Sequence, residues 1–184
     1  MTRPISALSE HPAAGVSQQA HETAWKASYE AFVRRHGARL VRSLTLVSLD
    51  PELAADSAQD AFLQLHLHWD KVQKYEDPVA WLYRVGVNRS KDYRRRLIRT
   101  AKLFKRLVDA SPPESNRVDW EGRHESLAIF GPLPLRQRTA AALFYHADFS
   151  VAEIAAVMNI SEGAVKSHLF RARESLRTEL GAGS

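Results

Sequence analysis

Apolar positions in the first half of the chain recur every three or four residues, as expected of helices that bury one face. Two of these helices are also marked at their start, because Asp50-Pro51 and Asp77-Pro78 each join a capping aspartate to a proline at the first helical position. No segment shows the apolar–polar alternation of a half-buried strand. The pattern predicts an all-α fold with helices over about residues 22–44, 51–69 and 78–98, and a loop over 72–77.

The C-terminal part carries the pattern of a helix-turn-helix, in which two helices meet at a tight turn. Ser150 and Glu153 have the spacing of a capping box, where each side chain satisfies a free amide of the first helical turn. Asn159 falls where the chain must turn, and asparagine tolerates the left-handed conformation. Ser161 then caps a second, longer helix. The apolar side of that helix consists of Val165, Leu169, Ala172 and Leu176.

The opposite face of the second helix is polar and basic. In helix-turn-helix proteins this helix lies in the major groove, where lysine and arginine pair with guanine edges or phosphates and phenylalanine contacts a thymine methyl. A solvated basic face on an ordinary helical hairpin is the alternative, but the capping box, the turn and the apolar spacing together favour DNA binding. The candidate DNA-binding residues are Lys166, Ser167, Phe170, Arg171 and Arg173.

The chain is expected to form two small helical domains joined by a flexible linker. Residues 100–122 are polar and contain the run Ser111-Pro112-Pro113, a composition suited to a linker. A helix beginning near Leu133 should brace the helix-turn-helix, because two short helices bury too little surface alone. The expected division is a flexible tail over 1–20, a first domain over 21–99, a linker over 100–122 and a second domain over 123–180.

Composition narrows the function classes. The 184 residues carry a formal net charge of +5, which favours an anionic partner, and they include no cysteine, so disulfides, thiolate nucleophiles and cysteine-type zinc sites are excluded. No apolar run reaches membrane-spanning length and the N-terminus lacks the apolar core of a signal peptide, so we expect a cytoplasmic protein without membrane insertion.

The helix predicted over 78–98 has one apolar and one polar side. Asparagine can hydrogen-bond a base edge through both a donor and an acceptor, and arginines suit phosphates. A solvated helix end is the alternative interpretation, since arginine also stabilises a helix C-terminus. The apolar side consists of Leu82, Val85, Gly86, Tyr93 and Leu97, and the polar side of Arg84, Asn88, Lys91, Asp92 and Arg95.

Taken together, these motifs resemble the bacterial sigma factors of the sigma-70 family, and the small two-domain plan resembles their extracytoplasmic-function (ECF) group. The resemblance covers about residues 27–99 and 133–180, and motifs of both halves occur in the family's order. The segments that carry it are 56–62, 80–88 and 92–95 in the first half, and 133–138 and 161–173 in the second.

The resemblance implies a surface for RNA polymerase on the helix over 51–69. In the family this helix docks on the clamp helices of the largest polymerase subunit, and Asp56 and Asp60 would suit a basic coiled coil. Phe62 is expected in the core by its spacing. The implied polymerase-binding residues are Asp56, Gln59, Asp60 and Leu63.

The resemblance also assigns promoter reading to both domains. The first would read the minus-ten element as an opened strand, with Tyr75 stacking on a flipped base. Trp81 would suit a melting wedge, although its spacing favours the core. The implied minus-ten residues are Tyr75, Arg84, Asn88, Lys91 and Asp92, and the basic face of the second helix over 161–173 would read the minus-thirty-five element. Ala164 and His168 depart from the family's frequent threonine and arginine, so His168 weakens an expected phosphate contact.

The implied protein is a dissociable promoter-specificity subunit without chemistry of its own and without a cofactor. Its implied partners are core RNA polymerase, promoter DNA and an anti-sigma protein. A conventional helix-turn-helix regulator is the alternative, but it would need a receiver or ligand domain, and residues 20–99 show neither strands nor an acidic phosphorylation pocket. An enzyme is disfavoured because no nucleophile-and-base set is visible, and His66 and His68 point to different sides of a helix. A pure interaction module would leave the basic helix unexplained.

Overall fold

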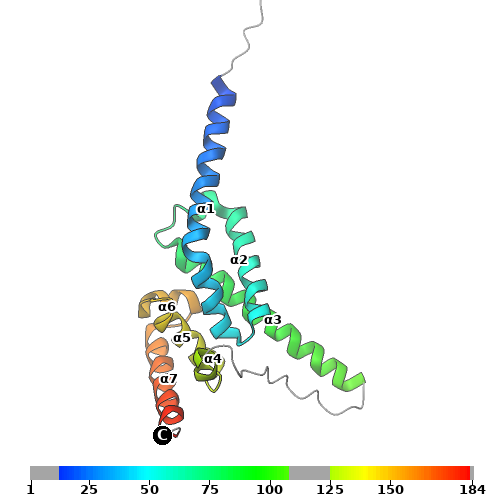
Figure 1. Ribbon diagram of the computed structural model, residues 1–184, viewed down its shortest axis with the longest axis vertical. Helices are drawn as coiled ribbons and strands as arrows, with labels where there is room; N and C mark the ends of the chain where they lie inside the picture. Colours follow the sequence, from blue (N-terminus) through cyan, green and yellow to red (C-terminus); the bar gives the residue numbers. More distant parts are fainter. Residues whose placement is uncertain (1–12, 108–124, 183–184) are drawn as a thin grey trace, which may run out of the picture.

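The computed structural model describes residues 13–107 and 125–182, and every regular element within these stretches is an α-helix. The all-α prediction is therefore confirmed. In chain order the helices are α1 (Ala13–Ser48), α2 (Pro51–Val72), α3 (Pro78–Leu107), α4 (Glu125–Phe130), α5 (Leu135–Tyr145), α6 (Val151–Met158) and α7 (Glu162–Ala182). We refer to α1–α3 as the first domain and to α4–α7 as the second (Figure 1).

The predicted aspartate caps set the starts of α2 and α3. Asp50 accepts hydrogen bonds through Oδ1 from the amides of Glu52 and Leu53, at 3.0 and 3.1 Å. Asp77 accepts one from the amide of Ala80 at 2.8 Å. These bonds satisfy amides that have no partner within the helix, so both boundaries follow from local sequence.

The core of the first domain lies where α1, α2 and α3 pack on one another. Leu40 and Leu44 of α1 meet Gly86 of α3, where an added Cβ would lie only 3.1 Å from Leu44 Cδ1. Glycine therefore suits this close approach of the two helices, because an added Cβ would force the Leu44 side chain to shift by a few tenths of an ångström. The other fully buried apolar residues of the domain include Val47, Leu65, Val72, Leu82, Tyr83 and Val87.

The helix-turn-helix is confirmed in detail. The amide of Ser150 donates to Glu153 Oε2 at 2.6 Å, and the amide of Glu153 donates to Ser150 Oγ at 3.2 Å, which completes the capping box. Asn159 ends α6 in the left-handed conformation, with φ 53° and ψ 56°. The amide of Ala164 donates to Ser161 Oγ at 3.2 Å, so Ser161 caps α7 as predicted.

Two helices are longer than the sequence pattern predicts. The expected tail is wrong for Ala13–Ala20, which form the start of α1 because alanine and glutamine favour the helix; residues 1–12 lie outside the described part of the chain. Residues 100–107 of the predicted linker continue α3, and 108–124 are not described. Because α3 runs past the ends of its neighbours, Leu97, expected on an apolar face, is 58% exposed (Figure 1).

The two domains pack directly against each other. α5 contacts α1, and α6 contacts α3 along the side of the first domain (Figure 1). One continuous cluster of buried residues includes Leu40 and Tyr83 of the first domain together with Leu143, Phe149 and Ile154 of the second. None of the helices within 13–107 and 125–182 is long and apolar enough to cross a bilayer.

Candidate nucleic-acid interface

α7 has a basic face that points to solvent, because the opposite side of the helix is buried. Val165, Leu169 and Ala172 are buried against the second domain, so residues between them in the helical turn must point away. Phe170 is 63% exposed, so its ring is open to a partner. All five predicted residues of this face are exposed: Lys166, Ser167, Phe170, Arg171 and Arg173.

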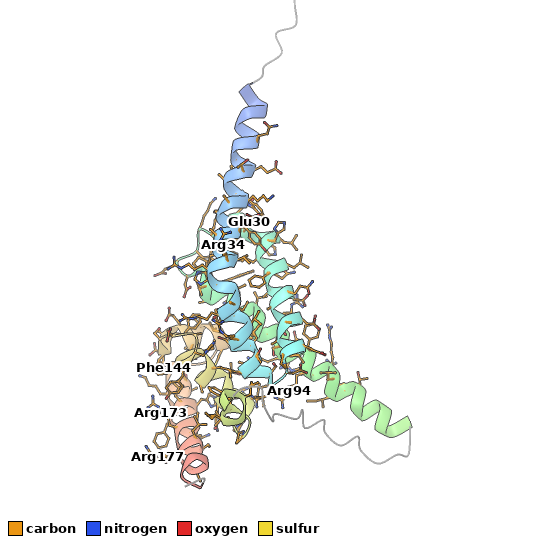
Figure 2. All side chains as sticks on the ribbon, in the orientation of Figure 1. Glu30, Arg34, Arg94, Phe144, Arg173 and Arg177 are labelled. Atoms are coloured by element: carbon orange, nitrogen blue, oxygen red, sulfur yellow. The ribbon has the colours of Figure 1, made fainter. Side chains whose placement is uncertain are left out.

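Most of the charged side chains on this face have no ion-pair partner among the described residues. Among the described residues, neither Lys166 nor Arg171 has a carboxylate within ion-pair distance. Arg173 Nε donates to the Tyr145 hydroxyl at 2.7 Å, which orients the guanidinium without neutralising it. Arg177, one turn further, pairs with Glu174 at 3.1 Å. Figure 2 shows Arg173 and Arg177 along α7, at the end of the molecule remote from the start of α1.

His168 lies at the edge of this face and is half-buried. Burial lowers its pKa, and the nearby guanidinium groups of Arg136 and Arg171 lower it further. The imidazole is therefore neutral at pH 7, and its Nδ1 is buried without a hydrogen-bond partner. This lowered pKa disfavours a charged phosphate contact from His168, in line with the weakening expected from the sequence.

The predicted minus-ten residues are only partly brought together. Arg84, Asn88 and Asp92 are exposed on α3, while Lys91 is half-buried and its pKa is lowered by burial and by Arg136. Tyr75, in the turn between α2 and α3, is 37% exposed. Asp92 is also engaged, because its Oδ1 lies 3.5 Å from Arg95 Nη1.

Tyr75 and Arg84 share an open groove of about 810 Å³ with Trp81. The other wall of this groove belongs to the second domain and includes Glu153. Trp81 is half-buried, packs against the core and meets His68 edge-on, with ring centroids 6.4 Å apart. Its indole therefore packs against the core, as its spacing predicts, and also lines the groove.

The predicted polymerase-binding residues form a stripe along α2. Asp56 and Gln59 are exposed, and Leu63 is 53% exposed. Leu67, one turn further, is 62% exposed and continues the stripe, a residue that the sequence reasoning missed. Leu67 could have been predicted, because residues four apart lie on the same side of a helix and Leu67 follows Leu63 by four.

Asp60 makes two contacts with α3 that the sequence did not predict. Its Oδ2 accepts a hydrogen bond from the Tyr93 hydroxyl at 3.0 Å and lies 3.7 Å from Arg89 Nε. The hydrogen bond to Asp60 is the main cause that raises the pKa of Tyr93. Asp60 thus joins α2 to α3, and its carboxylate is half-buried instead of fully presented to a partner.

His66 and His68, which the sequence places on different sides of α2, both pack against aromatic rings. The His66 ring meets Trp25 and Tyr29 edge-on, with centroids 4.9 and 5.1 Å away. His68 faces Trp81. Within the described residues no three metal-ligating side chains are grouped.

Two family models match the chain. Residues 32–100 match the family described as Sigma-70 region 2, and residues 129–176 match Sigma-70, region 4. The first match covers most of α1–α3, and the second covers the helix-turn-helix with the helix before it.

The sequences of two relatives align with most of this chain. The ECF RNA polymerase sigma factor SigM of Mycobacterium tuberculosis is 30% identical over 162 residues, covering 88% of this chain and 82% of that protein. The RNA polymerase sigma-E factor of Streptomyces coelicolor is 30% identical over 158 residues, covering 84% and 86%.

Solved structures have a similar fold. CnrH in complex with the cytosolic domain of CnrY has a TM-score of 0.61 at 26% identity, covering 86% of this chain and 91% of that one. The sigma factor RpoE in complex with the anti-sigma factor NepR from Bartonella quintana has a TM-score of 0.69 at 22% identity, covering 84% and 97%.

Proposed function

Because this chain belongs to the ECF group of the sigma-70 family, we propose that its two domains divide promoter recognition between the α3 and α7 faces described above. The protein is a transcription initiation factor, which binds core RNA polymerase and directs it to specific promoters. The proposed boundaries of the two working domains are residues 21–99 and 123–180.

The minus-thirty-five element is read by α7 as duplex DNA. The observation that carries this assignment is the free basic face of a helix whose start is fixed by a capping box, a left-handed turn and a serine cap. Lys166 and Arg171 reach guanine edges or phosphates, and the exposed Phe170 ring contacts a thymine methyl. Ser167 and Arg173 complete the face, the latter oriented by Tyr145.

The minus-ten element is read by the first domain as a single strand. Tyr75 stacks on a base flipped out of the opened non-template strand, and Asn88 hydrogen-bonds an exposed base edge. Arg84 and Lys91 supply cations for the phosphates, and Asp92 orients Arg95. Capture of unpaired bases traps the melted state, so no fuel is consumed.

Core polymerase binds the α2 stripe. Asp56 and Gln59 offer polar contacts to a basic coiled coil, and the exposed Leu63 adds apolar area beside them. Asp60 contributes from a position fixed by Tyr93. Polymerase then holds the two domains one promoter spacer apart.

The proposal includes control by an anti-sigma protein and a cytoplasmic site of action, where DNA and polymerase are found. The matched CnrH structure was solved with a protein partner, the cytosolic domain of CnrY. A partner that covers the α2 stripe or the reading faces would keep this factor from polymerase or from DNA.

The test is transcription by core RNA polymerase, with and without the protein, on a pool of promoter-like DNA. Transcripts that require the protein and share two upstream motifs support the proposal and reveal its specificity. Tight duplex binding by the protein alone, without any dependence on core polymerase, would contradict it and favour a conventional helix-turn-helix regulator.

Substitutions then separate the two reading faces. Lys166→Ala with Arg171→Ala should relax selection of the upstream motif, because each side chain that reads a base edge contributes about 1–3 kcal/mol of discrimination. Asn88→Ala should relax selection of the downstream motif only. Arg177→Ala is the matched control, because Arg177 lies on the same helix but is paired with Glu174.

A further inference from the structure

The C-terminal part of α3 extends beyond the helices that pack against the rest of it. Figure 1 shows its last turns leaving the body of the molecule. Every side chain from Arg94 to Thr100 is exposed, including the apolar Leu97 and Ile98 at 58% and 47%. The match to Sigma-70 region 2 ends at residue 100, whereas α3 continues to Leu107. Packing within the first domain therefore does not explain why α3 continues this far.

This extension is strongly basic. Residues 94–107 include no acidic residue and seven basic ones, which are Arg94, Arg95, Arg96, Arg99, Lys102, Lys105 and Arg106. Of the arginines up to residue 99, only Arg95 has an ion-pair partner among the described residues, because its Nη1 lies 3.5 Å from Asp92 Oδ1. Both side chains of that pair are exposed, so it contributes little. Like charges three or four residues apart destabilise a helix, and an anionic partner would relieve this repulsion.

Part of this charge continues the face of α3 that is proposed to read the minus-ten element. That face includes Arg84, Asn88 and Lys91, at intervals of four and three residues. Intervals of three or four keep residues on one side of an α-helix. Four basic residues continue the same series beyond Lys91, and we refer to them as the distal stripe: Arg95, Arg99, Lys102 and Arg106. The reading face and the distal stripe therefore lie along one side of α3.

The position of the distal stripe fits duplex DNA upstream of the minus-ten element. The chain continues from the C-terminal end of α3 to the second domain, which is proposed to read the upstream element. This end of α3 is therefore expected to point upstream, towards the paired DNA that joins the two elements. The eleven steps from Arg95 to Arg106 correspond to about 16 Å of helix, which matches about five base pairs of duplex.

The side chains of the distal stripe suit phosphates better than bases. All four are cationic, whereas base reading with a donor and an acceptor on one side chain needs an amide such as that of Asn88. A basic helix with exposed apolar residues such as Leu97 also fits an anionic lipid surface. Continuity with the reading face favours DNA, because one strand can pass from the unpaired bases to the distal stripe along a single side of α3.

We propose that the distal stripe of α3 binds the phosphate backbone of the duplex immediately upstream of the minus-ten element, independently of its base sequence. The place of the DNA in this assignment rests on the proposed function. The distal stripe has a positioning role, because it holds paired DNA next to the face that captures unpaired bases.

Two double substitutions remove the same charge from different sides of α3. Arg99→Gln with Arg106→Gln removes two members of the distal stripe. Arg94→Gln with Arg96→Gln is the matched control, because both residues belong to the same part of the helix but fall outside the series. The Arg96 guanidinium lies over the Tyr93 ring instead, 5.9 Å from its centroid. Glutamine is a good helix former, so both variants should keep the helix.

The measurement is the affinity of core polymerase, carrying the full-length parent or variant protein, for two promoter fragments without the minus-thirty-five element. Both carry the minus-ten element as a single strand, and only the longer one adds about ten base pairs of upstream duplex, twice the length that the distal stripe spans. On the longer fragment the stripe variant should bind about tenfold more weakly than the parent. Its slope of log affinity against log salt should be smaller by about two, because two phosphate contacts are lost.

The comparison fragments and the control variant make the result specific. On the shorter fragment the stripe variant should bind like the parent, and on the longer one its loss should be the same for every upstream base sequence. The control variant should bind both fragments like the parent. An unchanged affinity of the stripe variant for the longer fragment, or an equal loss in both double variants, would overturn the proposal. So would a loss that occurs with one upstream sequence only.

Two further outcomes separate the alternatives. If the parent protein, but not the stripe variant, floats with phosphatidylglycerol vesicles while both bind the longer fragment equally, the distal stripe binds lipid and the DNA assignment is wrong. If the parent protein does not direct core polymerase to any promoter, the proposed function fails and the assignment of the distal stripe fails with it. Promoter-dependent transcription by the parent, together with a stripe variant that binds like the parent, would overturn the stripe assignment alone.

Discussion

At the scale of single residues, the structure adds a buried arginine that sequence patterns do not reveal. Arg138 is 4% exposed and donates to two carbonyls, those of Val47 and Leu133. Burial lowers its pKa to about 10, so the guanidinium remains charged at neutral pH. Its main acceptor lies 91 residues away in the chain. Helical spacing reports only neighbours along the helix, so no local pattern could indicate this contact.

Removal of Arg138 should destabilise the fold. Arg138→Met keeps much of the side-chain volume but leaves two buried carbonyls without donors, and we expect a loss of about 1–3 kcal/mol in the free energy of unfolding. Arg136→Met, an exposed arginine on the same helix, should change it by less than about 0.5 kcal/mol. Urea denaturation measures both. Equal effects of the two substitutions would argue against a structural role for the buried hydrogen bonds.

At the scale of elements, local chemistry made the helix starts predictable. The Asp50 and Asp77 caps, the Ser150–Glu153 box and the Asn159 turn involve residues at most three or four apart, and the structure confirms all of them. The start of α1 and the end of α3 were less predictable, because the sequence signals neither a helix start at Ala13 nor a stop beyond Ile98. α4 was missed because six residues are too few to show a period.

The Asn159 turn gives an element-scale prediction. Its φ of 53° disfavours residues with a Cβ, so Asn159→Ala should destabilise the second domain by about 1 kcal/mol. Asn159→Gly adopts this conformation without strain and should remain close to the parent protein. Thermal unfolding followed by circular dichroism compares the two. A glycine variant as unstable as the alanine variant would mean that the asparagine side chain itself, not its backbone conformation, supports the turn.

The hydrogen bond between α2 and α3 gives a second prediction at the scale of elements. The Tyr93 hydroxyl and the Asp60 carboxylate form a hydrogen bond between the helix proposed for polymerase and the helix proposed for DNA. A double-mutant cycle with Asp60→Asn and Tyr93→Phe should yield a coupling free energy of about 1 kcal/mol in urea denaturation. Asp56→Asn with Tyr93→Phe, in which Asp56 is exposed, is the control pair and should be additive. Additivity in both cycles would show that the observed bond does not hold the two helices together.

At the scale of the whole molecule, the sequence predicted both domains but not their packing. Tyr83 lies on α3 and Phe149 in the connection between α5 and α6, and no local pattern says which element covers either ring. The structure shows that they cover each other. The predicted reading face on α3 was likewise correct about exposure for Arg84 and Asn88. Lys91 is instead half-buried, and its pKa is lowered by burial and by Arg136 of the other domain.

The contact between the domains should weaken in acid. His146, in the second domain, is half-buried beside Arg42 and Arg39 of α1, and its Nε2 has no hydrogen-bond partner. Burial lowers its pKa most, the two arginines lower it further, and Asp148 opposes them. Because the folded pKa lies below the unfolded value of about 6.5, the stabilisation from a neutral imidazole is complete above that pH. It is lost as the pH falls below that value and through the lower pKa of the folded state.

The free energy of unfolding should therefore fall between pH 7.5 and pH 5.5, and His146→Asn should make this fall smaller because the substituted side chain does not titrate. His36, whose pKa is lowered by burial and by Arg35 and Arg39, contributes in the same direction. His21→Asn, on the exposed start of α1, is the control and should leave the slope unchanged. If His146→Asn and His21→Asn have the same slope as the parent protein, the acid sensitivity does not arise at the contact between the domains. If only His146→Asn flattens the slope, protonation of His146 destabilises the packing between the domains.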